Sequence, residues 1–307
     1  MTLAGQNRGH KKKHMWMAAA GLCLSGAVLC AAAVGCGLAD ADRVEGELQS
    51  LAQSTNVTPT PAGSTAVPRP LEEPSPEVPA DTDEGLTALE KDLVFLEESG
   101  IPVPEKEIDF ADLMENTNKD IYAWIYVPGT QVDYPVLRHP EDNSYYLDYN
   151  IDGTKGYPGC IYTEDYNAMD FTDFNTVLYG HNMKNGTGFG SLHKFEDAEF
   201  FEENRYVYVY TQERLLAYEI FGAYEFSNIH LLAGYDAESE WGISTYLKEV
   251  EEVRGMKCNR KDEIFPDEQD HIITLSTCVS GNKQKRYLVQ GVLLNEMTLE
   301  ETGDMTE

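Results

Sequence analysis

Short strand-like segments, separated by turn residues, run through most of the chain after residue 120 and restrict its fold more than any other feature. They are rich in β-branched and aromatic residues and are bounded by Pro, Gly, Asn or charged residues. The segments cover residues 122–127, 132–137, 159–162, 176–179, 206–210, 215–221, 271–277 and 286–294. This pattern predicts a mainly β protein, a closed or nearly closed β-barrel with peripheral helices.

Helical spacing of apolar residues predicts helices over 86–99 and 239–253, and a further helix is expected over 109–119. We expect the first two to pack on the barrel through their apolar faces, because these faces would otherwise stay in water. The face of the first comprises Leu86, Leu89, Leu93 and Leu96. The face of the second comprises Trp241, Tyr246, Leu247 and Val250.

Three reactive side chains lie at the ends of predicted strands. Cys278 ends one strand and Arg286 opens the next, so a hairpin with a polar loop over 279–285 would bring them to the same end. His181 follows the strand over 176–179. A thiol attacks as its thiolate and needs a base or cation nearby, while histidine transfers protons and arginine stabilises an oxyanion. The three residues predict a thiol acyl-transfer site.

Each of these residues also has an ordinary explanation when it is taken singly. A cysteine at a strand end is often buried and inert, and an arginine at a strand start often only faces water. Of the seven histidines, His139, His193, His230 and His271 carry no motif. The joint arrangement favours chemistry.

Four sequence blocks resemble the signature segments of class B sortases, in the same order. They are IYAWIYVPGTQVDYPV (121–136), DNSYYL (142–147), YGHNMKNGTGFGSLHKF (179–195), and TLSTC followed by RYLVQG (274–278 and 286–291). The resemblance extends over residues 86–295. It implies a sortase-type barrel with N-terminal helices and a long helix between the sixth and seventh strands.

The resemblance also implies roles for individual residues. Cys278 would be the nucleophile, His181 the general acid and base, and Arg286 the group that holds the substrate carbonyl or stabilises the oxyanion. Substrate-binding positions would be Asn143, Leu147, Tyr179, Ser276 and Thr277. Cys160 stands where a small residue is usual and is expected to be inert. No cofactor is implied, and the absence of a CxxC or His/Cys cluster gives no metal site.

The implied activity is that of a cysteine transpeptidase of the Gram-positive cell surface. Such an enzyme cleaves a C-terminal sorting motif of the NPxTx type in secreted proteins. It then transfers the acyl group from its cysteine to an amine of a peptidoglycan precursor. Three alternatives stay open: a thiol hydrolase or protease of surface proteins, a pilin-polymerising sortase with a lysine acceptor, and a non-enzymatic binding module.

The N-terminal region predicts a membrane anchor. A basic cytoplasmic segment over 1–14 precedes residues 15–39, which carry no charge and would form a helix about 37 Å long at 1.5 Å per residue. This exceeds the roughly 30 Å hydrocarbon core, and the charges predict a single pass with the remaining chain outside the cell. A cleaved signal peptide and a lipoprotein site at Cys36 are the competing interpretations.

Composition divides the rest of the chain. Residues 40–82, with seven prolines between Pro59 and Pro79, predict a disordered linker; the catalytic domain should cover 83–297 and an acidic tail 298–307. The formal net charge of −30 excludes nucleic acid and anionic lipid headgroups as partners. Of six cysteines, Cys160, Cys258 and Cys278 fall in the predicted external part, so at least one thiol is free unless two chains pair.

Overall fold

The computed structural model describes residues 40–56 and 85–295. The predicted anchor over 15–39, the middle of the predicted linker and the acidic tail lie outside these residues. In the described ranges, no helix combines the length and the apolar character that crossing a membrane requires.

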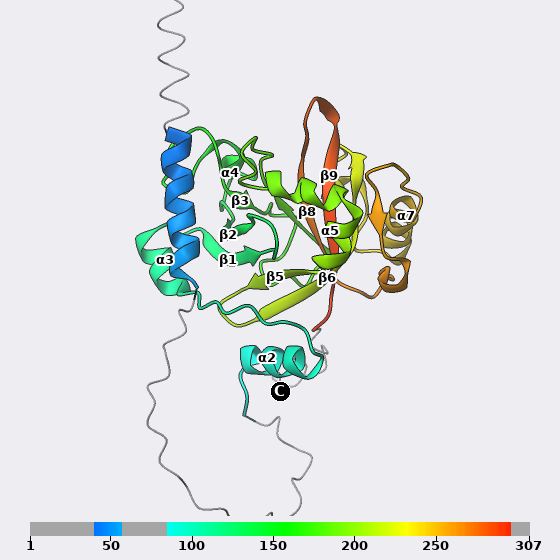
Figure 1. Ribbon diagram of the computed structural model, residues 1–307, viewed down its shortest axis with the longest axis horizontal. Helices are drawn as coiled ribbons and strands as arrows, with labels where there is room; N and C mark the ends of the chain where they lie inside the picture. Colours follow the sequence, from blue (N-terminus) through cyan, green and yellow to red (C-terminus); the bar gives the residue numbers. More distant parts are fainter. Residues whose placement is uncertain (1–39, 57–84, 296–307) are drawn as a thin grey trace, which may run out of the picture.

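A closed β-barrel forms the centre of the described domain (Figure 1). Its strands run in the order β5-β1-β2-β3-β4-β8-β9-β6, and pairing of β5 with β6 closes the barrel, while β7 extends the sheet beside β6. The strands are β1 (Ile121–Tyr126), β2 (Asp133–Leu137), β3 (Ile161–Tyr162), β4 (Asn175–Tyr179), β5 (Tyr206–Tyr210), β6 (Leu215–Ser227), β7 (Asn259–Arg260), β8 (Ile272–Val279) and β9 (Asn282–Leu293). The predicted closed barrel is confirmed.

Large side chains are buried on both faces of the barrel wall, because successive residues of a strand point to opposite faces. Trp124 of β1 and Tyr208 of β5 share one face, and Tyr218 of β6 lies on the other, since Tyr208 pairs with Ala217; all three are almost fully buried. Burying a side chain of this size stabilises the fold by about 2 kcal/mol or more. Polar atoms of these aromatic side chains find hydrogen-bond partners at the edge of the core. For example, Trp124 Nε1 donates to Asp133 Oδ1 at 2.8 Å.

Helices cover the outside of the barrel. They are α2 (Ala88–Glu98), α3 (Phe110–Asn116), α4 (Tyr145–Asp148), η1 (Gly190–Glu196), α5 (Ala198–Glu203), α6 (Leu231–Gly234), α7 (Glu240–Glu251) and η2 (Asp262–Ile264). The predicted long helix between the sixth and seventh strands is confirmed as α7, which lies against one side of the barrel (Figure 1).

The predicted apolar face of α7 is wrong at one position. Ile243, Tyr246, Leu247 and Val250 are buried against the barrel, whereas the side chain of Trp241 is 77% exposed. At 100° per residue, Trp241 lies on the opposite side of the helix from Val250. Its large apolar ring therefore projects into solvent.

The predicted face of α2 is also only partly buried. Leu96 is fully buried, but Leu89 and Leu93 are each about 37% exposed. The helix is held by a polar contact instead: Asp92 is 3% exposed and accepts from Arg214 Nε at 2.7 Å and Nη2 at 2.8 Å. A Thr87–Glu90 capping box starts the helix.

The prediction of a disordered linker over 40–82 is wrong for its first part. Residues 40–54 form a helix that lies along the barrel on the side away from α7 (Figure 1). Val44 and Leu48 are buried, and Arg43 Nη2 pairs with Asp152 Oδ2 at 2.8 Å. Val44, Leu48 and Leu51 are spaced as an apolar face of a helix, which indicates a helix in this part of the chain. The linker prediction extended the proline-rich composition of the following residues over this helix.

Candidate active site

The β8–β9 hairpin places Cys278 directly opposite Arg286. The predicted polar loop over 279–285 is wrong, because β8 continues to Val279 and β9 begins at Asn282, with Gly281 at φ +79° in the tight turn. A bulge between Cys278 and Val279 shifts the register beyond the pair. Opposed residues of an antiparallel ladder have Cα atoms about 5 Å apart, so the thiol and the guanidinium start from neighbouring positions.

His181 reaches the same edge through a parallel strand pair. β4 runs parallel to β8, with Tyr179 paired to Ser276, so both strands end at one side of the sheet. His181 follows two residues after Tyr179, as Cys278 follows two residues after Ser276. This register explains why a histidine and a cysteine so far apart in the sequence meet.

A groove of about 210 Å³ joins the predicted catalytic residues. His181, Cys278 and Arg286 all line it. Among the predicted substrate-binding residues, Leu147, Tyr179, Ser276 and Thr277 also line it. Asn143 does not, and its carboxamide oxygen accepts instead from the backbone nitrogen of Asp165 at 2.9 Å, which fixes the turn before α4.

The imidazole of His181 is oriented by a backbone carbonyl. Its Nε2 lies 2.7 Å from the oxygen of Leu147, so Nε2 carries a proton and donates to it. Nδ1 is then the nitrogen left to exchange a proton. Tyr157 lies edge-on to the ring at 5.0 Å between centroids, which restricts rotation of the imidazole.

Cys278 differs from the other described cysteines in its access to solvent. Cys160, Cys258 and Cys278 all have free thiols, but Cys160 is buried and only Cys278 of the three is exposed. Burial raises the pKa of the Cys160 thiol well above its usual range, and burial also raises the pKa of Cys258. Neither thiol readily forms a thiolate, so Cys278 is the described cysteine suited to attack.

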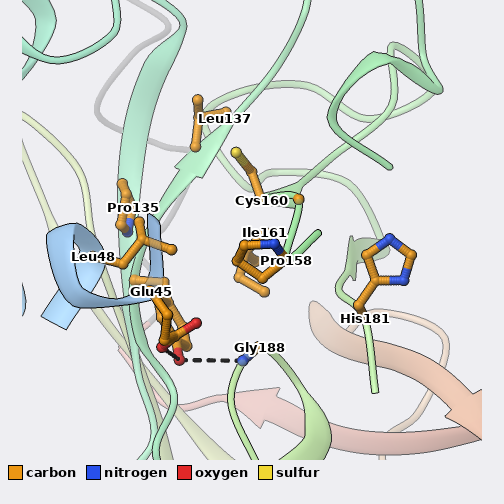
Figure 2. A pocket seen from close by; sticks show the side chains of 11 residues that line it. Glu45, Leu48, Pro135, Leu137, Pro158, Cys160, Ile161, His181 and Gly188 are labelled. Atoms are coloured by element: carbon orange, nitrogen blue, oxygen red, sulfur yellow. Dashed lines mark hydrogen bonds between the residues drawn. The ribbon is translucent and has the colours of Figure 1, made fainter. Parts of the chain in front are cut away.

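A second, smaller pocket lies behind His181. Figure 2 shows Glu45 and Leu48 projecting into it from the helix over 40–54, with Cys160 and His181 on the opposite wall. Tyr134 donates its hydroxyl to Glu45 Oε1 at 3.0 Å and accepts from the backbone nitrogen of Gly188 at 3.2 Å. Sequence reasoning missed this connection because it assigned residues 40–56 to a linker.

Sequence reasoning also missed a histidine–carboxylate contact in the main groove. Glu164 and His230 both line the groove, and His230 Nε2 lies 2.6 Å from Glu164 Oε2. The Tyr179 ring lies beside His230, and burial raises the pKa of Tyr179 so that it stays a hydrogen-bond donor. No spacing in the sequence links residues 164 and 230, since the barrel alone brings their segments together.

A closed barrel that presents a thiol, an imidazole and a guanidinium in one groove has the groups that thiol acyl transfer requires. The sortase domain family matches residues 125–294. Sortase B of Listeria monocytogenes is 31% identical over 185 residues, which are 60% of this chain and 73% of that protein. The chain belongs to the sortase family.

Solved structures place it beside the class B sortases. Clostridium perfringens sortase B is 31% identical with a TM-score of 0.54, and the match covers 60% of this chain and 100% of that one. A Streptococcus pyogenes class B sortase involved in pilus biogenesis is 25% identical with a TM-score of 0.52, covering 61% of this chain and 98% of that one. The chain is accordingly a cell-wall transpeptidase of this class.

Proposed function

We propose that this enzyme cleaves an NPxTx-like sorting motif of secreted proteins and joins the new carboxyl end to an amine of a peptidoglycan precursor. Cys278 is the nucleophile, His181 the general acid and base, and Arg286 the oxyanion partner. The observation that carries the proposal is the convergence of these three side chains in one groove.

The first half-reaction forms a thioester. The thiolate of Cys278 attacks the threonine carbonyl carbon, and the negative charge that develops on the oxygen is stabilised by the guanidinium of Arg286. When the carbon–nitrogen bond breaks, the Nδ1 proton of a protonated His181 passes to the departing amine. Its Nε2–H stays bound to the Leu147 carbonyl, which keeps the ring in place during the transfer.

The second half-reaction reverses these roles. The acceptor amine attacks the thioester and loses a proton to Nδ1 of His181. A new amide bond forms, the thiolate of Cys278 leaves, and the original ion pair is restored. Leu147, Tyr179, Ser276 and Thr277 are the groove residues that hold the sorting motif in the geometry for attack.

The identity of the acceptor distinguishes the proposed function from the two alternative enzyme activities. Water as acceptor would make the protein a thiol hydrolase, and a lysine side chain would make it a pilin polymerase. The Streptococcus pyogenes relative is described as involved in pilus biogenesis, so lysine belongs among the acceptors to be tested.

The location follows from the N-terminal sequence. The uncharged residues 15–39, with Lys11, Lys12 and Lys13 before them and Asp40 and Asp42 after them, support a single membrane pass with the barrel outside the cell. Detection of a mature N-terminus at or after Cys36 would contradict an uncleaved anchor.

A comparison of wild type with Cys278→Ala tests the proposed reaction. Both proteins are incubated with a library of sorting-motif peptides, with and without an amine acceptor. Wild type should release the C-terminal fragment and form the ligated product, whereas Cys278→Ala should lose at least about 10³-fold in rate because no other group can form the thioester. Cys258→Ala is the matched control and should keep wild-type turnover. Equal turnover of Cys278→Ala and wild type would contradict the proposal.

A further inference from the structure

The residues on either side of His181 are bound to Cys278 itself and to the residue before it. Asn182 follows His181, and its Nδ2 donates to the carbonyl oxygen of Cys278 at 2.7 Å. Gly180 precedes His181, and its carbonyl oxygen accepts from Thr277 Oγ1 at 2.8 Å. The segment carrying the imidazole is thus fixed to the strand carrying the thiol both before and after His181, and the backbone nitrogen of Gly180 also donates to the carbonyl of Ser276 at 3.2 Å.

Asn182 is itself held by a chain of polar side chains. Its Nδ2 lies 2.9 Å from His193 Nε2, and His193 Nδ1 lies 2.8 Å from Glu196 Oε1. The second carboxylate oxygen of Glu196 pairs with Lys257 Nζ at 2.6 Å. His193 also stacks on Tyr287, with 4.6 Å between ring centroids. The chain therefore runs from the surface to the backbone of the nucleophile.

The hydrogen-bond roles in this chain follow from the acceptor at Cys278. A carbonyl oxygen only accepts, so the amide nitrogen of Asn182 must face it. The second hydrogen of that nitrogen lies toward His193 Nε2 at 2.9 Å and Ser280 Oγ at 3.3 Å. When His193 Nδ1–H donates to Glu196, Nε2 accepts from Asn182. His193 Nε2 also lies 3.2 Å from the Cys278 carbonyl, but in this tautomer it has no hydrogen to donate there, so the NH₂ group of Asn182 joins the two.

We propose that Asn182 is a positioning residue that sets the separation of His181 and Cys278, and that His193 and Glu196 hold it in that role. Proton transfer between the imidazole and the reacting groups needs a fixed distance, and a shift of about 1 Å can cost roughly 100-fold in rate. Asn182 does not line the groove, so its effect falls on turnover rather than on substrate binding. This inference rests on the proposed function of the same site.

Two asparagines of one loop provide a matched test in the full chain. Asn182 acts as a donor, whereas the side chain of Asn185 accepts from the backbone nitrogen and the hydroxyl of Thr187. An aspartate keeps the acceptor and loses the donor. Asn182→Asp should lower kcat roughly 10- to 100-fold with KM changed less than about twofold, while Asn185→Asp should match wild type. Asn182→Ala removes the donor without adding charge and should resemble Asn182→Asp.

A second readout does not depend on peptide turnover. Alkylation of Cys278 by iodoacetamide is followed by peptide mass spectrometry across pH for wild type, Asn182→Ala and His193→Phe. Phenylalanine keeps the stack on Tyr287 and removes both ring nitrogens. His193→Phe should therefore shift the pH dependence of Cys278 alkylation in the same direction as Asn182→Ala, by a smaller amount. A role limited to folding would lower the melting temperature and leave the profile unchanged, which would overturn the proposal. Wild-type kcat together with a wild-type alkylation profile in Asn182→Ala would also overturn it. A reactive Cys278 in a wild type that turns over no peptide would count against the proposed function alone.

Discussion

At the scale of single residues, Glu45 links the N-terminal helix to the histidine loop. Its carboxylate is buried and accepts from Tyr134, whose hydroxyl accepts from Gly188. The backbone nitrogen of Phe189, the next residue, donates to the His181 carbonyl at 2.9 Å. A carboxylate outside the groove is thus connected through Tyr134 to the loop that supports the imidazole.

Burial raises the pKa of Glu45, and this makes stability depend on pH in a defined direction. An acid whose pKa is raised on folding stabilises the folded state most below its unfolded pKa, and that contribution is lost as pH rises through the folded pKa. Glu45→Gln should therefore raise the melting temperature near pH 8 and have little effect near pH 4. The difference should be about 1.4 kcal/mol for each unit by which folding raises the pKa.

Melting curves of wild type and Glu45→Gln across this pH range measure the effect. Glu47→Gln on the exposed side of the same helix is the control, and its curve should parallel that of wild type. Parallel curves for Glu45→Gln as well would show that the buried carboxylate is not the titrating group.

At the scale of elements, α2 is attached to the barrel through one buried ion pair. Asp92 accepts two hydrogen bonds from Arg214, one from the backbone nitrogen of Leu215 and one from Asn295 Nδ2 at 2.7 Å. Arg214 also donates to the Asn295 carbonyl at 3.0 Å. This cluster joins α2, the start of β6 and the end of β9.

Asp92→Ala should lower the free energy of unfolding by about 3–5 kcal/mol, because it leaves the Arg214 guanidinium without its charged partner in a largely buried site. Urea denaturation of the variant and wild type measures the loss. Glu97→Ala, at an exposed position of α2, should change stability by less than about 0.5 kcal/mol. A loss of similar size in both variants would show that the buried Asp92–Arg214 pair is not what holds α2.

Most elements could be predicted from sequence because their apolar residues repeat with a strand or helix period. The failures occur where tertiary contacts override a local signal. Lys283, Gln284 and Lys285 look like loop residues, yet they belong to β9: Lys285 pairs with Ser227 of β6, and the next residue, Asn228, donates to the carbonyls of Gln284 and Lys283. The reactive residues were predictable from motif and spacing, whereas Asn182 and Glu164 gain their partners only through the closed barrel.

At the scale of the whole molecule, the chain carries a formal net charge of −30. Its groove nevertheless contains a permanent cation, Arg286. A strongly negative surface attracts cationic molecules over a distance that shortens as salt increases. The proposed acceptor is an amine, which is largely an ammonium ion near neutral pH. The protein should therefore raise the local concentration of the amine acceptor, but not that of the protein that carries the sorting motif.

Transpeptidation with a cationic acceptor peptide should slow several-fold as ionic strength rises from about 0.02 to 0.5 M, because the attraction is screened. The step affected is acceptor capture, so peptide cleavage in the absence of acceptor should change little. Hydroxylamine, uncharged near neutral pH, is the matched acceptor and should show a much smaller salt dependence. Equal salt dependence for both acceptors would show that the net charge does not guide the amine.

The helix over residues 40–54 sets how far the barrel stands from its proposed anchor. A flexible linker over residues 40–82, as the composition predicts, would have a root-mean-square end-to-end distance of roughly 36 Å, and the domain could move over that range. The helix over residues 40–54 is about 22 Å long and is docked on the barrel through Val44 and Leu48. With the proposed anchor over residues 15–39, the barrel would work at one height above the bilayer, and a substrate would be selected by the length of chain between its sorting motif and its own membrane attachment. Spacer length then becomes part of substrate recognition, without any contact in the groove to encode it.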